Sequence, residues 1–333
     1  MDLELAPEHA TFRSEVRELA QGVVRPLAAE VDREHRFPEE GVRAAAESGL
    51  MGVLIPREYG GAGLDALAFA ICIEELAQAC ASTAVIVDVH TSVGTEPILL
   101  FGDEEQKKRW LPQLASGALL GAFALTEPAS GSDAASLKTT ARRNGHGYVL
   151  SGTKTFITNV GHAGLYVVFA RTGPDARAAG VTAFLVPAGS PGLRVGQVFD
   201  KMGLNGSPTG DISQAAVDEA RALMRDRGHE QGDEFTLADM ATRVESARLL
   251  AYHAAWLCSR DAPFTRPASM AKLHCTDTAM QVAIDALQIA GEEGARAGST
   301  FERHMRDAKA LQIYEGSNQV QRIVIARELV NTG

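Results

Sequence analysis

The sequence predicts an α+β protein in which an N-terminal helical domain, a central β domain and a C-terminal helical bundle follow one another. Two observations carry this prediction. Apolar residues recur at helical spacing in the first and last thirds of the chain. Between them lie short apolar and β-branched runs that Gly, Pro and Ser residues separate. We therefore expect domains over residues 1–117, 118–213 and 214–333, the last of them shortened.

The N-terminal third carries clear helix signals. The stretch from Leu64 to Ala79 is rich in alanine and has apolar residues three and four positions apart, which predicts an amphipathic helix. Asp103 precedes two glutamates and then three basic residues, the charge order expected of an N-cap and the helix dipole. These patterns predict a helical domain.

The central segment has the pattern of an antiparallel sheet. Asn144-Gly145 is a typical hairpin turn, and strand-forming residues follow it at 148–150. Because no long helix separates the later apolar runs, we predict a small antiparallel barrel or sandwich. Its further strands are expected at 154–158, 166–170, 181–186 and 193–198.

The C-terminal third returns to helical spacing. From Leu237 to Ala251 apolar residues step by three and four positions. The same behaviour over 277–290 and 313–329 predicts two more helical segments, the second interrupted near Gly316.

Composition argues against several classes of protein. With 45% apolar and 22% charged residues in 333, the chain is able to bury a large core. Its net charge of -10 argues against a duplex nucleic-acid binder and against a polybasic membrane-surface protein. The four cysteines lack metal-ligand and Cys-x-x-Cys spacing, and the N-terminus lacks a signal-peptide pattern. We expect a soluble, cytoplasmic protein with free thiols and no bound metal.

Common catalytic motifs do not occur in the sequence. Gly61-Ala62-Gly63 follows no apolar strand, so it does not predict a dinucleotide-binding turn. There is no Walker loop, no His-Glu-x-x-His pair and no Gly-x-Ser-x-Gly elbow.

Two segments carry chemistry of another kind. LTEPASGSD (125–133) offers backbone N–H groups, hydroxyls and a glycine in one short turn, which suits a phosphate or a polar ring edge. In IYEGSNQVQR (313–322), Glu315 precedes a helix-breaking glycine, so its carboxylate is able to project from a helix end as a general base. By composition alone, an ordinary surface loop and a solvated glutamate are the favoured alternatives.

Together with further motifs in the same order, these segments resemble the acyl-CoA dehydrogenase family of flavoproteins. The other matching motifs are PREYGGAGLD, FGDEEQKKRWLPQLASG, SGTKTFITN, LADMATRVESARLL, MAKL and MRDAKALQIYEGSNQVQRIVIARELV. The resemblance covers nearly the whole chain. It implies the same order of helical, β and helical domains, and an FAD-dependent oxidoreductase of fatty acid metabolism that acts on CH–CH donors.

The resemblance implies a division of labour at the active site. In the family a glutamate removes the α-proton of an acyl thioester while the β-hydrogen leaves as hydride to flavin N5, and Glu315 has the matching position. The backbone N–H of the same residue and a flavin ribityl hydroxyl polarise the thioester carbonyl. Ser132, Gly316 and Arg327 are the other substrate-binding residues that the resemblance implies.

FAD is the cofactor that the resemblance implies. The implied contacts are Leu125 and Thr126 at the ring edge, Gly131 and Ser132 beside the ribityl-pyrophosphate, Phe156 and Thr158 flanking the ring, Ser317 and Gln319 near the phosphates and adenosine, and Arg227 and Gln288 from across a dimer. A homodimer or homotetramer follows, with an electron-transfer flavoprotein as electron acceptor. Neither nucleic acid nor a membrane is expected as a partner.

The chain departs from the family pattern in three places. Several helical turns of the family pattern are missing from this chain after Ser213. A short GHEQG follows Arg227 in place of the family's aromatic-Gly pair, and the loop after Gln288 reads Gly-Glu-Glu-Gly. Glu292 and Glu293 of that loop oppose a phosphate by about 1 kcal/mol per close exposed pair. These departures keep an alternative open, a catalytically impaired relative that binds an acyl thioester or a protein. Oxygen activation for hydroxylation ranks below both, because it needs no Tyr-Glu-Gly base. The acyl chain, and whether coenzyme A or a carrier protein bears it, stay open.

Overall fold

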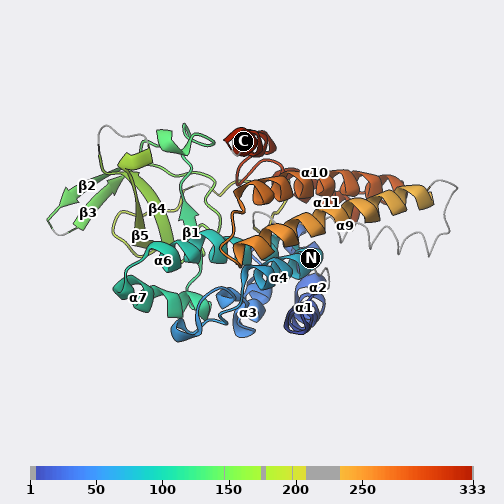
Figure 1. Ribbon diagram of the computed structural model, residues 1–333, viewed down its shortest axis with the longest axis horizontal. Helices are drawn as coiled ribbons and strands as arrows, with labels where there is room; N and C mark the ends of the chain where they lie inside the picture. The colour runs from blue at the N-terminus through green and yellow to red at the C-terminus, as the bar shows by residue number, and fades with distance from the viewer. Residues whose placement is uncertain (1–4, 146, 174–177, 197, 208–232, 332–333) are drawn as a thin grey trace. The chain divides into compact units, whose positions relative to one another are not determined.

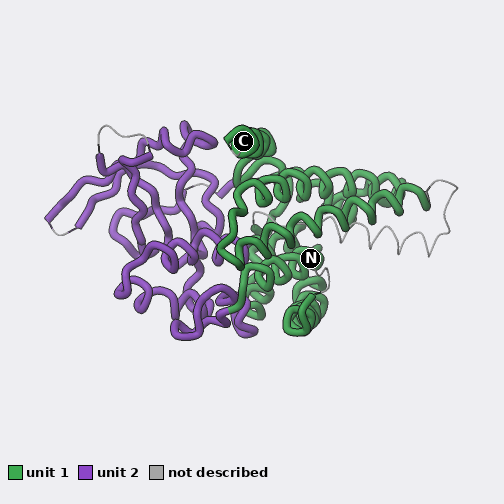
Figure 2. Tube along the Cα trace, viewed as in Figure 1, with its two compact units in different colours: residues 1–45, 64–85, 200–333 green, residues 46–63, 86–199 purple. Residues whose placement is uncertain are grey.

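The computed structural model describes residues 5–145, 147–173, 178–196, 198–207 and 233–331 (Figure 1). The chain forms two compact units, which Figure 2 colours separately. Unit 1 comprises residues 1–45, 64–85 and 200–333, and unit 2 comprises residues 46–63 and 86–199.

Unit 1 is helical. Its helices are α1 (Pro7–Leu19), α2 (Arg25–Glu34), α3 (Glu39–Glu47), α4 (Ala66–Ala79), α9 (Asp233–Cys258), α10 (Thr265–Ala290), α11 (Thr300–Leu311) and α12 (Asn318–Asn331). The end of α3 lies in unit 2, and α5 (Ala81–Val89) likewise begins in unit 1 and continues into unit 2. The helices predicted at 64–79, 237–251 and 277–290 are confirmed, and Asp65 caps the first of them by accepting the N–H of Ala68.

Apolar side chains from α9, α10 and α11 form the core of the C-terminal part of unit 1. One cluster consists of Met240, Val244, Val282, Ala286, Ala290 and Phe301. A second joins α10 and α11 to Leu204, the most deeply buried residue of the segment after Asp200. Met240 and Val244 of α9 pack against Val282 and Ala286 of α10 in the first cluster, and the two helices lie next to each other in Figure 1.

Buried ion pairs connect α1, α4 and α9. Glu75 of α4 has no exposed surface. The guanidinium of Arg17 of α1 donates to both of its carboxylate oxygens, at 2.7 and 2.8 Å. The neighbouring Glu74 accepts from Arg13 of α1 and from Arg248 of α9. Removing one partner of such a pair would leave a desolvated charge, so the network fixes how these helices pack.

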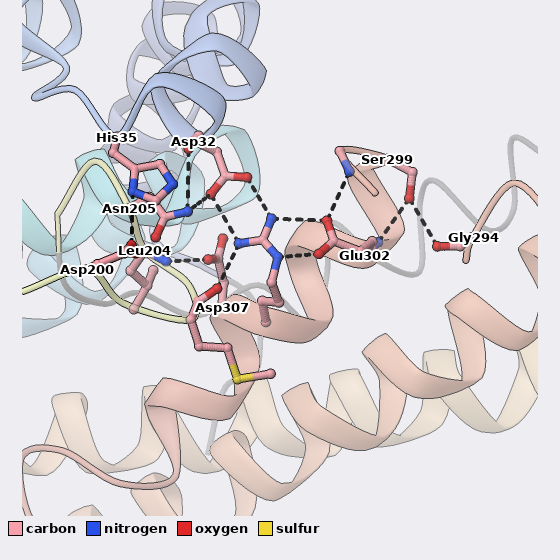
Figure 3. Close-up of polar contacts among 12 residues, drawn as sticks. Asp32, His35, Asp200, Leu204, Asn205, Gly294, Ser299, Glu302 and Asp307 are labelled. Carbon is pink, nitrogen blue, oxygen red and sulfur yellow. Dashed lines mark hydrogen bonds and ion pairs between the residues drawn. The ribbon is translucent and has the colours of Figure 1, made fainter. Parts of the chain in front are cut away.

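A second polar cluster anchors residues 200–207 to α2 and α11 (Figure 3). Asp307 of α11 accepts the backbone N–H of Leu204 at 2.5 Å. Asp32 of α2 accepts from the amide of Asn205 at 2.9 Å and from Arg306 at 2.6 Å. Burial raises the pKa of Asp307 to about 6, because the one backbone hydrogen bond and nearby arginines do not offset the lost hydration.

Unit 2 combines short helices with one sheet. Its helices are α6 (Glu96–Phe101) and α7 (Glu104–Ala115), and its strands are β1 (Gly121–Ala124), β2 (Thr140–Asn144), β3 (Gly147–Ser151), β4 (Leu165–Arg171) and β5 (Val181–Pro187). Asp103 caps α7 in a reciprocal capping box with Gln106, as the sequence predicts. The hairpin at Asn144-Gly145 is confirmed as well, and the left-handed φ of Gly145 (61°) is the conformation this turn demands.

The prediction of an antiparallel barrel or sandwich is wrong. The described strands form one mixed, open sheet, in which β4 pairs in parallel with β1 and antiparallel with β5. β2 and β3 pair antiparallel, and β2 joins β4 through a single parallel contact at Thr140 and Arg171. Parallel pairing depends on contacts between residues far apart in the chain, which the local pattern of apolar runs does not encode.

Three predicted elements are also wrong in detail. Neither 154–158 nor the described part of 193–198 is a strand. The helix predicted over 313–329 begins only at Asn318, after a turn. In the first case, positive φ angles at Phe156 (55°) and Asn159 (62°) are incompatible with extended pairing.

A buried histidine joins the helices of unit 2 to its sheet. His90 lies in the π-helical turn His90–Thr95, and its Nδ1 accepts the N–H of Gly121, the first residue of β1, at 2.9 Å. Its Nε2 lies 3.1 Å from the carbonyl of Leu114. Burial lowers the pKa of His90 to about 4, so the ring is neutral and serves as a structural link.

One helical stretch is long and apolar. Ala81–Phe101 spans 21 residues with a mean hydropathy of 1.3 in its best window. By length and composition alone such a stretch is able to cross a membrane, but 56% of that window is buried inside the fold. Core helices of globular proteins have the same properties.

Candidate active site

The turn that carries Glu315 lies in unit 1, between the end of α11 and the start of α12. Glu315 (φ 51°) and Gly316 (φ 86°) both have left-handed backbone conformations. The second is natural for glycine, whereas the first is uncommon for a residue with a side chain and costs about 1–3 kcal/mol. Such strain persists only where neighbouring contacts impose it, and it is concentrated at functional sites.

The carboxylate of Glu315 has the electrostatic character of a general base. Glu315 is exposed, but the protein atoms around its carboxylate replace part of its hydration, and this desolvation raises the pKa of Glu315. The positive charge of Lys272 on α10 acts in the opposite direction and lowers it. A raised pKa makes a carboxylate a stronger base, provided that it still ionises at working pH.

The residues next to Glu315 occupy the first turn of α12. The carbonyl of Ser317 accepts the N–H of Gln321, and the carbonyl of Gly316 accepts from the Gln321 side chain at 3.1 Å. Gln319 is exposed one residue inside the helix. The break near Gly316 that the sequence predicts is therefore confirmed, whereas the helical segment predicted before it, from Ile313, is not helical.

The structure does not bring the other unit 1 candidates to this turn. Gln288 is exposed in the last turn of α10, 16 residues beyond Lys272 and thus about 24 Å along the helix. Arg327 is exposed on α12, about 14 Å beyond Asn318. Arg227 lies outside the described residues. The distance of Gln288 agrees with a role across a subunit interface, which stays a prediction.

Unit 2 places two of the predicted cofactor segments side by side. The segment after β1 and the segment after β3 are joined by a backbone hydrogen bond from Thr155 to Thr126 at 2.9 Å. Lys154 adds a bond from its ammonium group to the carbonyl of Leu125, also at 2.9 Å. The sequence named these segments separately, and their pairing is a result of the fold.

A buried ion pair fixes the two segments. Glu127 accepts from Lys154 at 2.8 Å and from the backbone N–H groups of Lys138 and Thr139 at 2.5 and 2.8 Å. Burial alone would raise the pKa of Glu127, but these donors outweigh it and hold the pKa at about 2. Glu127 is therefore a constant negative charge whose three hydrogen bonds hold the loop in one conformation.

Phe156 has the features of a residue that contacts a ligand. Its side chain is 72% exposed, and it stacks on Phe199 with ring centroids 5.0 Å apart and an angle of 28°. Its positive φ adds backbone strain. An exposed aromatic pair on a strained backbone suits the face or edge of a planar ring.

Three hydroxyl side chains in the predicted cofactor segments have no hydrogen-bond partner among the described residues. Thr126, Ser132 and Thr158 form no side-chain hydrogen bonds within the described part of the structure, and Gly131 has open space where a Cβ would lie. These groups are available to a polar cofactor, as the flavin ring edge and ribityl chain require. The described residues of unit 2 therefore fit a flavin.

Sequence reasoning missed four residues that support these segments. They are Glu127 and Lys154 in unit 2, and Lys272 and Asn318 in unit 1. Each lay inside a motif that was quoted for its resemblance, but no role was assigned to it. The sequence pattern that could have identified them is a charged or amide residue within a run of apolar or small residues. Such a residue is expected to find a buried polar partner in the fold.

Three family models match the chain in succession. They describe the N-terminal domain of acyl-CoA dehydrogenase over residues 6–118, the middle domain over 122–217 and the C-terminal domain over 209–330. The chain belongs to the acyl-CoA dehydrogenase family. The resemblance read from the sequence motifs and the order of helical, middle and helical domains are thereby confirmed.

Relatives of this acyl-CoA dehydrogenase family member span its whole length. An acyl-CoA dehydrogenase of Bacillus subtilis is 40% identical over 376 residues, which cover 98% of this chain and 99% of the relative. The mitochondrial short-chain specific acyl-CoA dehydrogenase of Bos taurus is 39% identical over 378 residues, covering 99% of this chain and 92% of the relative.

Solved structures agree with this assignment. Butyryl-CoA dehydrogenase from Megasphaera elsdenii superimposes with a TM-score of 0.94 at 33% identity, covering 99% of this chain and all of that one. An acyl-CoA dehydrogenase from Bacillus anthracis complexed with FAD gives a TM-score of 0.90 at 27% identity, covering 100% of this chain and 68% of that one.

The chain is shorter than the aligned family members. The alignment with the Bacillus subtilis protein extends over 376 residues against 333 in this chain, so at least 43 aligned positions have no counterpart here. The matches to the middle and C-terminal domains overlap over 209–217. The departures that the sequence showed after Ser213 and Arg227 lie outside the described residues.

Proposed function

We propose that this enzyme removes two hydrogens from the α- and β-carbons of an acyl thioester, with Glu315 as the base that takes the α-proton. As a member of the acyl-CoA dehydrogenase family it is an FAD-dependent oxidoreductase. The observation that carries the assignment of the base is the Glu315 turn, where a strained backbone presents an exposed carboxylate whose pKa is raised by lost hydration and lowered by the charge of Lys272. A carboxylate in that state is suited to remove a weakly acidic C–H proton.

The proposed cofactor residues divide between the two units. Leu125, Thr126, Gly131, Ser132, Phe156 and Thr158 belong to unit 2, while Ser317, Gln319 and Gln288 belong to unit 1. FAD, when bound, accepts the hydrogen and the electron pair that leave the β-carbon. The protein orients the thioester by the backbone N–H of Glu315, and it holds the departing α-proton on the Glu315 carboxylate.

We propose a short acyl thioester as substrate. The support is that similar proteins bear the names short-chain specific acyl-CoA dehydrogenase and butyryl-CoA dehydrogenase. Both coenzyme A and carrier-protein thioesters have the acidified α-carbon that this chemistry needs. Turnover of butyryl-CoA against butyryl-pantetheine and a butyryl-carrier protein, with an artificial electron acceptor, distinguishes them.

The proposed partners follow from the chemistry of the reduced cofactor. Two electrons must leave after each turnover, and an electron-transfer flavoprotein is the acceptor that we propose. A homodimer or homotetramer is proposed because Gln288 lies far along α10 from the Glu315 turn. The described residues contain no disulfide between Cys72, Cys80, Cys258 and Cys275, which agrees with the reducing compartment, such as the cytoplasm, that we propose.

Replacement of Glu315 tests the proposed base. Glu315→Gln keeps the size and one carbonyl oxygen of the side chain but removes its basicity. We expect retained FAD, measured by the visible absorbance of the purified protein, with turnover of butyryl-CoA reduced by about 100-fold to 10,000-fold. The exposed Glu105→Gln serves as the matched control and should leave turnover unchanged. Near-normal turnover of the Glu315 variant would show that another group takes the proton.

A catalytically impaired relative is the second candidate. It is favoured by the aligned positions that this chain lacks and by the exposed Glu292 and Glu293 in the predicted cofactor loop. A visible spectrum separates the two candidates. A bound-flavin absorbance supports the enzyme, whereas a colourless protein that added FAD does not reconstitute supports the binding scaffold.

A further inference from the structure

A lysine on α10 joins the two ends of the turn that carries Glu315. The Nζ of Lys272 donates to the carbonyl of Leu311, the last residue of α11, at 2.9 Å. It also donates to Oδ1 of Asn318, the first residue of α12, at 3.0 Å. Six residues, 312–317, lie between these contacts, so a single ammonium group closes the loop that contains the proposed base.

Asn318 is the centre of the network on this side of the turn. Its side chain is nearly fully buried, and its Oδ1 accepts from Thr276 at 3.0 Å as well as from Lys272. Its Nδ2 donates to Asp277 at 2.7 Å, and its backbone N–H donates to the carbonyl of Gln312 at 3.1 Å. Both the oxygen and the nitrogen of the buried amide thus take part in holding α10 against the turn.

Charged groups from three helices surround the turn. On α10, Lys272 has its pKa lowered by burial, while Glu315 and Asp277 act to raise it. Asp277 is itself paired with Arg322 of α12 at 3.3 Å, and Lys309 of α11 contacts Gln312 rather than the glutamate. Lys272 is the charged side chain that opposes the effect of desolvation on Glu315.

We infer that Lys272 is a positioning residue for Glu315, because its ammonium group is hydrogen-bonded to both ends of the turn that carries Glu315. This inference rests on the proposed function, in which Glu315 must be deprotonated to react. Without the lysine charge, desolvation would act on the glutamate unopposed. The base would then be protonated over more of the working pH range.

The pH profile of turnover tests the electrostatic part of this inference. In Lys272→Gln and Lys272→Met, the acid limb of kcat/KM should move to higher pH, because the charge that lowers the pKa of Glu315 is gone. Turnover on that limb should fall by about tenfold for each unit of displacement and recover at higher pH. Lys272→Arg keeps the charge and should keep the limb in place.

A matched control separates charge from mechanical support. Thr276→Val removes one hydrogen bond to Asn318 but no charge, so it should lower turnover equally at all pH values. An acid limb that stays fixed in both neutral Lys272 variants would overturn the inference, and so would one that moves as far in Thr276→Val.

A stability cycle gives a readout that does not depend on turnover. At pH 8, Lys272→Met should lower the urea midpoint in the wild-type background but lower it less in the Glu315→Gln background, where no carboxylate is left unpaired. Equal losses in both backgrounds would contradict an interaction between the two side chains. If Glu315→Gln retains activity while this coupling is present, the proposed function fails but the interaction between the Lys272 charge and the Glu315 carboxylate stands.

Discussion

Glu127, Asp307 and Glu315 each lose hydration in the folded protein, and their neighbours decide how each one ionises. Desolvation raises the pKa of Glu127, Asp307 and Glu315 alike. Around Glu127 an ammonium group and two backbone N–H groups reverse the effect, whereas Asp307 has one N–H and keeps a pKa of about 6. Glu315 has only the charge of Lys272 acting against desolvation. The same residue chemistry therefore gives a fixed charge, a titrating acid and a proposed base.

The raised pKa of Asp307 predicts how the stability of the fold depends on pH. Its folded-state pKa lies above its ordinary value of 3.8, so the folded state binds more protons than the unfolded state between about pH 4 and 6. Stability should therefore fall as pH rises through this range. Asp307→Asn keeps an acceptor for Leu204 and removes the titration, so above pH 7 it should be more stable than the parent, by as much as about 3 kcal/mol.

Urea unfolding at pH 4 and pH 8 measures this difference. The exposed Asp239→Asn is the control, and its effect should be the same at both pH values. If Asp307→Asn destabilises the protein equally at both, the carboxyl group of Asp307 does not titrate as inferred.

At the scale of elements, polar side-chain contacts hold the irregular segments that follow β1 and β3 and the turn between α11 and α12. The segments after β1 and β3 have no ladder of strand pairing, and they are joined by the bonds of Thr126, Glu127 and Lys154. The turn between α11 and α12 is held in the same manner by Lys272 and Asn318. In both places a buried charge fixes an irregular backbone that regular secondary structure does not support.

Breaking the Glu127–Lys154 pair gives the prediction at this scale. Glu127→Gln and Lys154→Met should each destabilise the protein by about 3–5 kcal/mol, because each leaves the partner charge buried and unpaired. The double variant should lose much less than the sum of the two. Urea unfolding of the three variants measures this, and additive losses would show that the pair does not act as a unit.

The same pair predicts a response to acid. Because the pKa of Glu127 is lowered to about 2 from an ordinary 4.5, its stabilisation is complete above about pH 4.5 and is lost as pH falls toward 2. The stability difference between the parent and Glu127→Gln should therefore shrink on acidification across this window. A constant difference from pH 6 to pH 2.5 would contradict the lowered pKa.

At the scale of the whole molecule, the fold belongs to a family whose aligned members are longer. Unit 1 supplies the proposed base and unit 2 the proposed flavin segments, while at least 43 aligned positions have no counterpart in this chain. The predicted cofactor loop also carries Glu292 and Glu293, both exposed. FAD affinity is accordingly the property in which we expect this protein to differ most from its longer relatives.

Removal of the acidic pair makes the prediction at this scale. Glu292→Gln with Glu293→Gln should tighten FAD binding by up to about fivefold per charge at low salt, because each carboxylate repels the cofactor phosphates by about 1 kcal/mol or less. The gain should shrink at high salt. A flavin fluorescence titration at two ionic strengths measures it, with Glu104→Gln and Glu105→Gln as the control pair. Unchanged affinity at low salt would place the phosphates away from this loop.

The sequence was most informative where structure depends on neighbours in the chain. Asn144-Gly145 specifies its own hairpin, and Asp103 with Gln106 specifies its own helix start, because these signals act within four residues. The motif order likewise identified the family without any coordinates. The sequence failed at 154–158, where Lys154 turns its side chain to Glu127 and Phe156 adopts a left-handed backbone that ends any strand.

By itself, then, the amino-acid sequence determined the family, the order of helical and sheet segments and the identity of the proposed base. Only the tertiary structure decided that the sheet is mixed, that the two proposed flavin segments are bonded to each other, and that Lys272 bonds both ends of the turn of Glu315. The reason is physical. Local propensities and motifs are properties of neighbouring residues, whereas desolvation and pairing of charge depend on which distant groups the folded chain brings within a few ångströms.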